Sequence, residues 1–412
     1  MKKIMALTLV LILLLASVAC AQGDTPGTGS APPASGSASN EVFKIVAYQP
    51  LSGGNATFGN AGKEGMDLAL KEINAAGGFN GVPGEITYFD TTSSVEEAVK
   101  IAQMIIETMD DINVVIASQG SSEVQATIQF LNDAKIYHFG LGTSAAWMTN
   151  PDHIWTHRAS INNIRTVPGL AKVVSDVLKY DTVAILSSTD EGGTTTTREL
   201  ERLLVEAGVT VTTYQEADIE ATSFPGQITQ ILNTNPDVIY ISGLGTQPAL
   251  MAQQIRFAGY DGLLLCKDPA AVDMINIGGD AMDYLFSVFP YITYQSLDEC
   301  DIPFMKAFQE RHLAEYGRLP QIEGTYRGYD TMMVIWEASK IAGSNDMEAL
   351  RVATGKVKME GLGGMMDYTK GDRESYSEFY AFICIDGKNV LFDNWFNGGG
   401  YQEYLARTGR AR

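Results

Sequence analysis

Two short loops of small, hydroxyl-bearing residues have the chemistry to bind an anion together. One covers residues 118–122 (SQGSS) after the apolar run NVVIA, and the other covers 140–145 (GLGTSA) after IYHF. Each offers hydroxyls and backbone N–H groups, and the first opens an expected helix with a partly positive N-terminus. Charge-assisted hydrogen bonds of this kind contribute about 1.5–3 kcal/mol each. Helix capping is the simpler role of either loop, but two such loops on neighbouring strands indicate a carboxylate site.

Acidic residues follow two apolar runs in the second half of the chain. Asp190 and Glu191 come after TVAILSS, and Asp268 comes after GLLLC. A carboxylate facing the small-residue loops across a cleft would hold the ammonium group of a zwitterion. Each acid is equally consistent with a solvated turn residue.

The motifs of several enzyme classes are missing from the sequence. Gly62-Lys63 is followed by Glu64 rather than by Ser or Thr, so no Walker A loop is present. Gly59, Gly62 and Gly65 do not have the GxGxxG spacing, and we interpret them as allowing close packing at a helix start. No GxSxG, SxxK or HExxH motif occurs either.

His153 and His157 are the pair whose spacing comes nearest to that of metal ligands. No third or fourth ligand lies at a suitable distance along the sequence, so we interpret both as polar surface residues. With no metal set and no nucleophile–base pair, the sequence predicts a binding protein without a cofactor rather than an enzyme.

The elements that would position these loops alternate between strand and helix patterns. The expected strands are 43–48, 85–89, 113–117, 136–139, 182–186, 209–214, 237–242, 262–266, 379–385 and 389–392. The expected helices are 62–75, 95–109, 123–133, 195–207, 224–233, 248–258, 302–316 and 326–342. Such alternation predicts two doubly wound α/β lobes with parallel sheets. Ligands of open α/β sheets bind beyond the carboxyl ends of the strands, which predicts a ligand cleft between the lobes.

Composition supports a globular chain of more than one domain. The sequence has 412 residues, 45% of them hydrophobic and 19% charged, and a formal net charge of −20. This length exceeds what a single core usually serves. The acidic excess argues against nucleic acid as a partner and against a basic patch that binds anionic lipid.

The N-terminus has the pattern of a secretory signal. Lys2 and Lys3 precede an apolar run over 4–16, which is shorter than the roughly 20 residues that span a bilayer. The run ASVAC ending at Cys20 resembles a lipobox, which implies a signal peptide over 1–19 and a lipid on Cys20. Cleavage after Ala21, which would release a soluble periplasmic protein, is the alternative.

Residues 20–40 are interpreted as the lipid anchor followed by a flexible linker. Almost all positions from 22 to 40 are Gly, Ser, Thr, Ala or Pro, a composition that cannot bury a core. Such a tether suits a folded body held away from a membrane. Of the other cysteines, Cys266 and Cys384 lie in apolar runs and are expected to be buried thiols, and an odd total of three with Cys300 leaves at least one unpaired within the chain.

Residues 48–59 (YQPLSGGNATFG) and 65–78 (GMDLALKEINAAGG) resemble the opening of branched-chain amino acid-type substrate-binding proteins of ABC transporters. These are extracytoplasmic receptors of the leucine/isoleucine/valine-binding family, with the type I periplasmic binding fold. Weaker matches follow at Ser121-Ser122, 142–144 (GTS), 277–280 (IGGD) and 326–330. The resemblance covers about residues 41–395.

This resemblance implies a function, partners and lobe boundaries. It implies hinge closure over a small amino acid-like ligand, delivery to an ABC permease and its ATPase, and a monomer. Lobe 1 would comprise 41–159 plus 290–368, and lobe 2 would comprise 160–289 plus 369–412. A ligand sensor that feeds a signalling partner, or a receptor for a non-amino-acid carboxylate or amide, remains an alternative.

The resemblance also implies which residues contact the ligand. The carboxylate would be held at Ser121 or Ser122 and at 142–144, and the ammonium by an acid on lobe 2. Phe58 and Tyr326 match aromatic residues of the family's pocket. The implied ligand-binding residues are Phe58, Ser121, Ser122, Gly142, Thr143, Ser144, Glu191, Asp268 and Tyr326.

The sequence departs from the family where the ligand's side chain would lie. A tyrosine common in relatives is replaced in the turn over 189–193 (TDEGG), and another aromatic residue is replaced over 244–246 (LGT). The cysteines of a disulfide found in some relatives are absent from lobe 1. Leucine-like specificity is therefore not expected, and a more polar amino acid, an amide or another small carboxylate fits as well.

Overall fold

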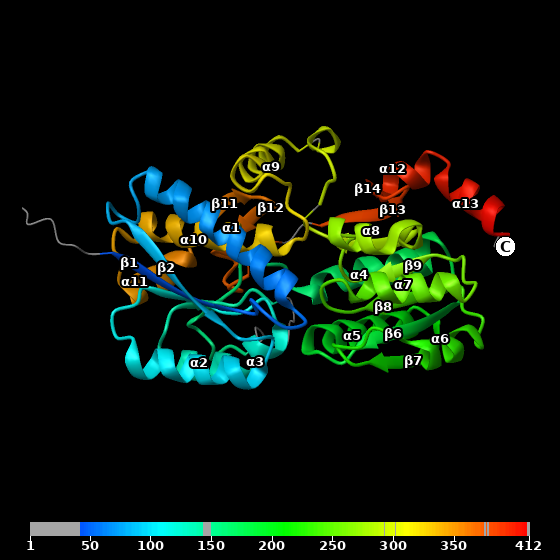
Figure 1. The fold of residues 1–412 in the computed structure, drawn as a ribbon, viewed down its shortest axis with the longest axis horizontal. Helices are drawn as coiled ribbons and strands as arrows, with labels where there is room; N and C mark the ends of the chain where they lie inside the picture. The colour runs from blue at the N-terminus through cyan, green and yellow to red at the C-terminus, as the bar shows by residue number, and fades with distance from the viewer. Residues whose placement is uncertain are drawn as a thin grey trace, which may run out of the picture. The chain divides into compact units, whose positions relative to one another are not determined.

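A computed structural model of the chain describes residues 42–142, 150–291, 293–300, 302–374, 376 and 379–409. Within these residues the strands form two large sheets and a separate hairpin (Figure 1). The first sheet has the order β2-β1-β3-β4-β5, and the second has the order β14-β13-β10-β9-β8-β6-β7.

The strands of the first sheet are β1 (Phe43–Gln49), β2 (Gly84–Asp90), β3 (Val114–Ile116), β4 (His138–Phe139) and β5 (Thr156–His157). Those of the second sheet are β6 (Thr182–Ser188), β7 (Thr210–Ala217), β8 (Val238–Ser242), β9 (Leu264–Cys266), β10 (Leu285–Phe289), β13 (Tyr380–Ile385) and β14 (Lys388–Leu391). The hairpin consists of β11 (Lys358–Gly361) and β12 (Gly364–Asp367). All pairings are parallel except β10–β13, β13–β14 and the hairpin. The predicted α/β fold with two doubly wound sheets is confirmed.

Helices connect the strands and cover both faces of each sheet. They are α1 (Ala56–Ala75), α2 (Val95–Thr108), α3 (Ser121–Asp133), α4 (Asn163–Lys172), α5 (Glu191–Glu206), α6 (Pro225–Leu232), α7 (Gln247–Phe257), α8 (Val272–Gly278), α9 (Pro303–Tyr316), α10 (Gly324–Ala342), α11 (Met347–Thr354), α12 (Phe392–Asn397) and α13 (Gly400–Thr408). A π-helical turn (Val173–Val177) continues α4, and 3₁₀ turns cover Gly279–Met282, Leu297–Glu299 and Tyr368–Lys370. No helix in the described part of the chain is long and apolar enough to cross a membrane.

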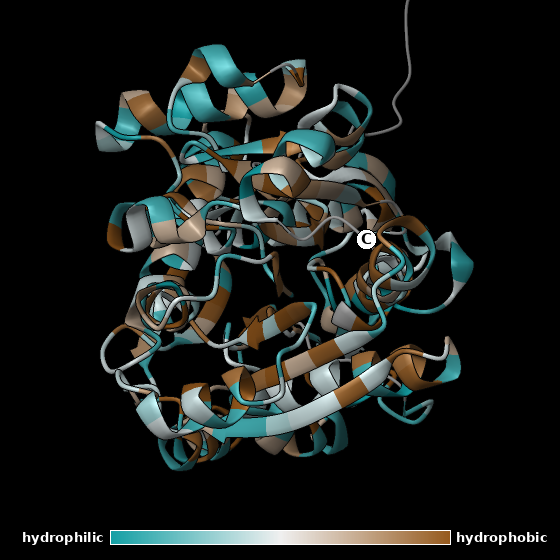
Figure 2. Cartoon of the chain, turned by 90° about the vertical axis from the view of Figure 1, so that its right-hand side faces the viewer, coloured by the Kyte–Doolittle hydropathy of each residue, from teal (hydrophilic) through white to brown (hydrophobic). Residues whose placement is uncertain are grey.

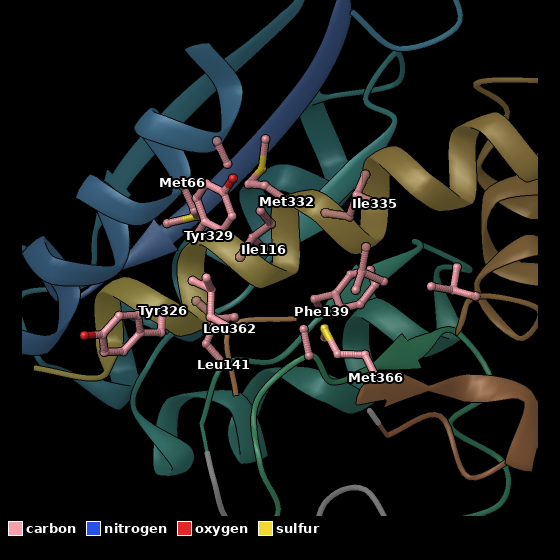
Figure 3. Close-up of a cluster of buried hydrophobic side chains, with 14 of the residues drawn as sticks. Met66, Ile116, Phe139, Leu141, Tyr326, Tyr329, Met332, Ile335, Leu362 and Met366 are labelled. Atoms are coloured by element: carbon pink, nitrogen blue, oxygen red, sulfur yellow. The ribbon is translucent and has the colours of Figure 1, made fainter. Parts of the chain in front are cut away.

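The alternation of side chains along β1 shows why the first sheet is covered on both faces. Ile45 and Ala47 belong to a core cluster with α1 and α10, whereas Val46 and Tyr48 belong to a cluster with α2 and α3. In Figure 1, α1 and α10 accordingly lie on one side of this sheet, and α2 and α3 lie on the other. Figure 3 shows the α10 side chains within the first of these clusters, near Met66 of α1 and Ile116 of β3.

The second sheet is covered in the same way. Ala184 and Leu186 of β6 join a cluster with α6, α7 and α8, whereas Val183 and Ile185 join a cluster with α4, α5, α12 and α13. Figure 2 shows hydrophobic residues along the strands and hydrophilic residues on the outward sides of the helices. Each sheet therefore has its own pair of cores.

Several elements were not predicted from the sequence. α4 contains Pro168, which reads as a helix breaker, although the helix continues through it. β5 and β9 are too short to stand out as periodic patterns, and only β9 was expected. α1 begins at Ala56 rather than at Gly62, and in its first turn a Cβ atom on Gly59 would lie 2.0 Å from the Pro50 carbonyl oxygen.

α1 and α10 cross with their backbones in contact, and glycines allow this approach. A Cβ atom on Gly65 would lie 2.0 Å from the Thr325 carbonyl oxygen, and one on Gly328 would lie 2.2 Å from that of Gly62. Real Cβ atoms do not approach this closely, so the crossing requires glycine on both helices. The packing role predicted for Gly59, Gly62 and Gly65 is confirmed.

We expect Gly65→Ala and Gly328→Ala each to lower the free energy of unfolding by about 1–3 kcal/mol or more, as overpacking does. Gly226→Ala is the matched control, since its new Cβ atom meets nothing within 4 Å, and helix propensity favours alanine there by up to about 1 kcal/mol. Urea denaturation of the three variants measures both effects. Equal stabilities of the crossing variants and the control would contradict this account of the crossing.

Candidate functional site

The carboxyl ends of strands from both sheets surround a small cavity of about 180 Å³. The first sheet and its helices contribute Asn55, Ser93, Val95, Gly120, Ser121, Ser122 and Glu123. The second sheet and its loops contribute Thr189, Asp190, Ile219 and Leu244. The cavity is smaller than the 300–1,000 Å³ typical of drug-sized ligands, so it suits a small solute. Three larger hollows, of about 630, 510 and 340 Å³, are lined by other residues.

Direct contacts join segments associated with the two sheets, one beside this cavity and one beside the hollow of about 630 Å³. The backbone N–H of Glu191, at the start of α5, donates to Ser122 Oγ at 3.1 Å. The N–H of Val272 donates to the carbonyl oxygen of Gln321 at 3.0 Å. The first contact joins α3 to α5, and the second joins α8 to the segment before α10.

The serines of the predicted carboxylate loop lie where the sequence placed them, at the N-terminus of α3. Ser121 is buried, and a Cβ atom on Gly142 would lie 2.8 Å from Ser121 Cα, so the two predicted loops touch. Ser160 Oγ donates to the Gly142 carbonyl oxygen at 3.3 Å. Thr143 and Ser144 lie outside the described residues. Backbone N–H groups at this helix start, together with two hydroxyls, can bind an anion.

Asp190, rather than Glu191, lines the cavity. Asp190 caps α5, because its carboxylate accepts from the Gly193 N–H at 3.1 Å and from the Ser188 hydroxyl. The Glu191 carboxylate accepts from Thr195 Oγ1 at 2.8 Å on its own helix. The cleft-facing acid is therefore the residue before the one predicted.

Asp268 follows β9 and is buried beside a lysine. Lys267 Nζ lies 2.7 Å from Asp268 Oδ2, and both side chains are buried. Burial lowers the pKa of Lys267, but the charges of Asp268 and Asp190 outweigh it, so this pKa is raised. Asp268 Oδ1 has no hydrogen-bond partner among the described residues, which leaves an acceptor for an ammonium group.

A second buried ion pair lies at the start of α10. Arg327 Nη2 lies 2.8 Å from Glu323 Oε1, and Arg327 Nη1 donates to Gln119 Oε1 at 3.4 Å. Burial raises the pKa of Glu323 to about 7; Asp268 adds to this rise, and Arg327 opposes it. The charges of the two ion pairs, one after β9 and one on α10, therefore interact with each other.

The two predicted aromatic residues lie apart from the cavity lining. The Phe58 ring is buried, and the Arg327 guanidinium carbon lies 5.4 Å from its centroid. Tyr326 is fully buried in the core of the first sheet, where its ring stacks on Tyr291 at 5.4 Å and its hydroxyl accepts from Gln309 at 3.1 Å.

His153 and His157 are buried, so the prediction that they are surface residues was wrong. His153 Nε2 lies 3.0 Å from Gln129 Oε1. His157 lies on β5 against the rings of Tyr137 and Phe139, and burial lowers its pKa to about 3, so it stays neutral. Among the described residues, no group of three His, Cys, Asp or Glu side chains is arranged to hold a metal.

The cysteine predictions are confirmed for the two residues in apolar runs. Cys266 and Cys384 are buried free thiols, and burial raises the pKa of each to about 12. Cys300 is buried as well, and Cys20 lies outside the described residues.

Sequence reasoning missed most of the cavity's acceptors. Asn55 precedes α1 and Ser93 follows β2, and neither lies in a distinctive motif. Glu123 reads as an ordinary acid in the first helical turn, although its position directly after Ser122 was a usable signal. Glu323 and Arg327 read as an exposed i, i+4 pair, but both are buried.

Comparison with known proteins agrees with this geometry. Residues 42–388 match the family described as periplasmic binding protein. The chain belongs to this family. Its membership implies an extracytoplasmic location and a binding role.

The names of two relatives of this periplasmic binding protein refer to amino acid binding. It is 23% identical to the leucine-, isoleucine-, valine-, threonine- and alanine-binding protein of Pseudomonas aeruginosa, over 80% of this chain and 87% of that protein. It is 26% identical to Leu/Ile/Val-binding protein homolog 2 of Brucella abortus, over 84% of this chain and 91% of that protein.

Solved structures share the fold of this periplasmic binding protein. A branched-chain amino acid transporter substrate-binding protein from Streptococcus pneumoniae, in complex with isoleucine, superimposes with a TM-score of 0.75 at 18% identity, over 85% of this chain and 98% of that one. A solute-binding protein of an ABC transporter from R. palustris, in complex with benzoate, superimposes with a TM-score of 0.76 at 17% identity, over 85% and 96% of the two chains. At these identities the likeness shows the fold alone.

The ion pair on α10 gives a test of the site's electrostatics. Arg327→Met leaves Glu323 buried without its partner, and breaking a buried pair in this way costs about 3–5 kcal/mol. Without Arg327, the pKa of Glu323 in the folded protein rises further above its value in the unfolded chain. The free energy of unfolding therefore falls as the pH rises through the folded-state pKa. We therefore expect urea denaturation to show a larger loss at pH 9 than at pH 6.

The double variant Glu323→Gln/Arg327→Met is the control for this prediction. It removes both charges, so it should recover most of the lost stability at pH 9. A double variant as unstable as Arg327→Met would show that packing, rather than the unpaired charge, causes the loss.

Proposed function

We propose that this chain is the solute-binding receptor of an ABC importer and that it captures a small amino acid-like ligand by hinge closure. The observation that carries the proposal is the cavity at which loops from both sheets meet, with hydroxyl groups and a carboxylate contributed from each side. A ligand that bridges the two sides shifts the population toward the closed arrangement. No bond is made or broken, and no cofactor is needed.

The lobes that would move are 41–159 plus 290–368 and 160–289 plus 369–412. The ligand carboxylate would lie at the N-terminus of α3, against Ser121 and Ser122 and beside 142–144. The ammonium would lie against Asp268, which has an unpartnered carboxylate oxygen. Phe58, Glu191 and Tyr326 do not line the cavity, and the position of Tyr326 in the core of the first sheet keeps it from the ligand. The named ligands of relatives favour an amino acid, while the benzoate complex supports other carboxylates as a second class.

We expect one or a few small carboxylates to raise the melting temperature of the protein. At 100 times its dissociation constant, a ligand that binds only the folded state adds about 2.7 kcal/mol to stability. Thermal unfolding against a panel of amino acids, amides and aromatic carboxylates measures this shift. Ser121→Phe should abolish it, because the ring fills the space for the carboxylate.

Ser296→Phe is the control, since Ser296 is exposed and does not line this cavity. Its ligand-induced shift should equal that of the unmodified protein. The melting temperature of each variant without ligand shows whether it folds. A folded Ser121→Phe variant with an undiminished shift would remove the carboxylate site from α3.

We propose further that lipid on Cys20 anchors the receptor to the bacterial membrane through the linker over 21–40. Cys20→Ala should then move the protein from the membrane fraction to the soluble fraction on centrifugation of cells. Continued sedimentation of the variant with membranes would refute the anchor. That result would also contradict cleavage after Ala21, which would release a soluble protein.

A further inference from the structure

Two buried acceptor atoms in the cavity have no hydrogen-bond partner among the described residues. They are Oδ1 of Asn55, whose side chain is 3% exposed, and Oε2 of Glu123, which is 4% exposed. Both residues line the cavity between the two sheets. A buried acceptor left without a donor costs roughly 1–3 kcal/mol, and more when it is charged. Both atoms are therefore available to accept a hydrogen bond from a ligand.

The charged residues that line the cavity also favour a ligand group with N–H donors. Asp190 is a second carboxylate in the wall, and both of its oxygens already accept, from Ser188 and from the Gly193 N–H. Among the described residues that line the cavity there is no Lys, Arg or His, and the buried cation Lys267 interacts with Asp190 from outside the lining. A ligand group with several N–H donors and a positive charge is the kind of group that such acceptors bind.

The environment of Glu123 raises the free energy of its charge. Burial raises the pKa of Glu123, and the nearby charge of Asp90 adds to the rise, although hydroxyls of Ser118 and Thr91 lower it. A position in the first turn of α3 stabilises a negative charge through the helix N-terminus. That role explains why an acid is tolerated there, but it supplies no donor to Oε2.

Apolar side chains complete the wall. Val95, Ile219 and Leu244 line the same cavity as the two acceptors. An aliphatic stem can pack against them while its charged end reaches Asn55 and Glu123, as amphipathic side chains do elsewhere. A volume of about 180 Å³ is the liquid volume of about six water molecules at roughly 30 Å³ each, which suits one short chain.

We propose that Asn55 and Glu123 bind a second, cationic nitrogen of the ligand, so that the solute is a small basic amino acid rather than a branched aliphatic one. This inference rests on the proposed function. The carboxylate would lie at the start of α3 and the stem against the apolar wall. The terminal ammonium or guanidinium would lie between Asn55 Oδ1 and Glu123 Oε2.

Lysine and norleucine test the proposal, because they have the same stem and differ only in the terminal ammonium. Isothermal calorimetry on the full chain should give a dissociation constant at least tenfold smaller for lysine. Ornithine has a shorter stem than lysine, and arginine has a guanidinium in place of the ammonium. One of these three basic amino acids should bind most tightly. Tighter binding of norleucine or leucine than of every basic amino acid would overturn the proposal and leave the receptor function intact. Binding of no small carboxylate at all would overturn both.

Glu123→Gln tests whether the second, cationic nitrogen of the ligand binds at Glu123. It should weaken binding of the preferred basic amino acid at least tenfold and leave norleucine unchanged. Glu107→Gln is the matched control, since Glu107 is exposed on α2, and it should bind as the unmodified protein does. Unchanged affinity for the basic amino acid in Glu123→Gln would overturn the assignment. If Glu123→Gln does not fold, Asn55→Leu removes the other acceptor without changing the charge, and the same tenfold loss is expected.

Discussion

The contact between the backbones of α1 and α10 positions much of what surrounds the cleft. α10 packs this closely against α1 only because Gly65 and Gly328 carry no side chain at the crossing. The approach brings the first turn of α10 beside Gln119, which donates to the Gly324 carbonyl oxygen at 3.2 Å. Gln119 in turn precedes Gly120 and the serines of α3. A change in the spacing of these helices would therefore reach the loop before α3 through the contact of Gln119 with Gly324.

Buried charge is the second constraint on this region. Lys267–Asp268 and Glu323–Arg327 are taken out of water as pairs, and such pairs rarely add much stability, because desolvation offsets their attraction. Their value lies in orientation. Each pair holds one charged group that still has an unpartnered atom, Oδ1 of Asp268 or Nε of Arg327. Polar atoms left in this way are typical of a site that is completed by a ligand or by water.

The sequence predicted the fold well, because the alternating strands and helices of a doubly wound fold give periodic patterns of apolar residues along the chain. β1, β6 and β8 are apolar runs bounded by turns, and α2 and α5 have a clear apolar face, so their order alone indicated two parallel sheets. The elements that were missed lack such a signal. α4 includes a proline, and β5 is two residues long and depends on pairing with β4.

The site was predicted less completely, for a physical reason. Loops after strands could be placed at one edge of a sheet, which located the serines of α3 and the acids after β6 and β9. Which of two adjacent acids faces the cavity depends on the cap geometry of α5, where Asp190 accepts from Gly193 and Glu191 turns to Thr195. Burial of Glu123, Glu323 and Arg327 depends on packing between segments far apart in sequence, and spacing does not report it.

The hydrogen bond from the Glu191 N–H to Ser122 Oγ uses no ligand atom. It joins elements of the two sheets directly, as does the bond between Val272 and Gln321. In the proposed hinge closure, such bonds would favour the closed arrangement whether or not a ligand is bound, so that arrangement would have a population of its own. The apparent dissociation constant is the intrinsic one divided by the competent fraction. If the protein closes over its ligand as proposed, stronger bonds between the halves would tighten binding of every ligand equally and slow its release.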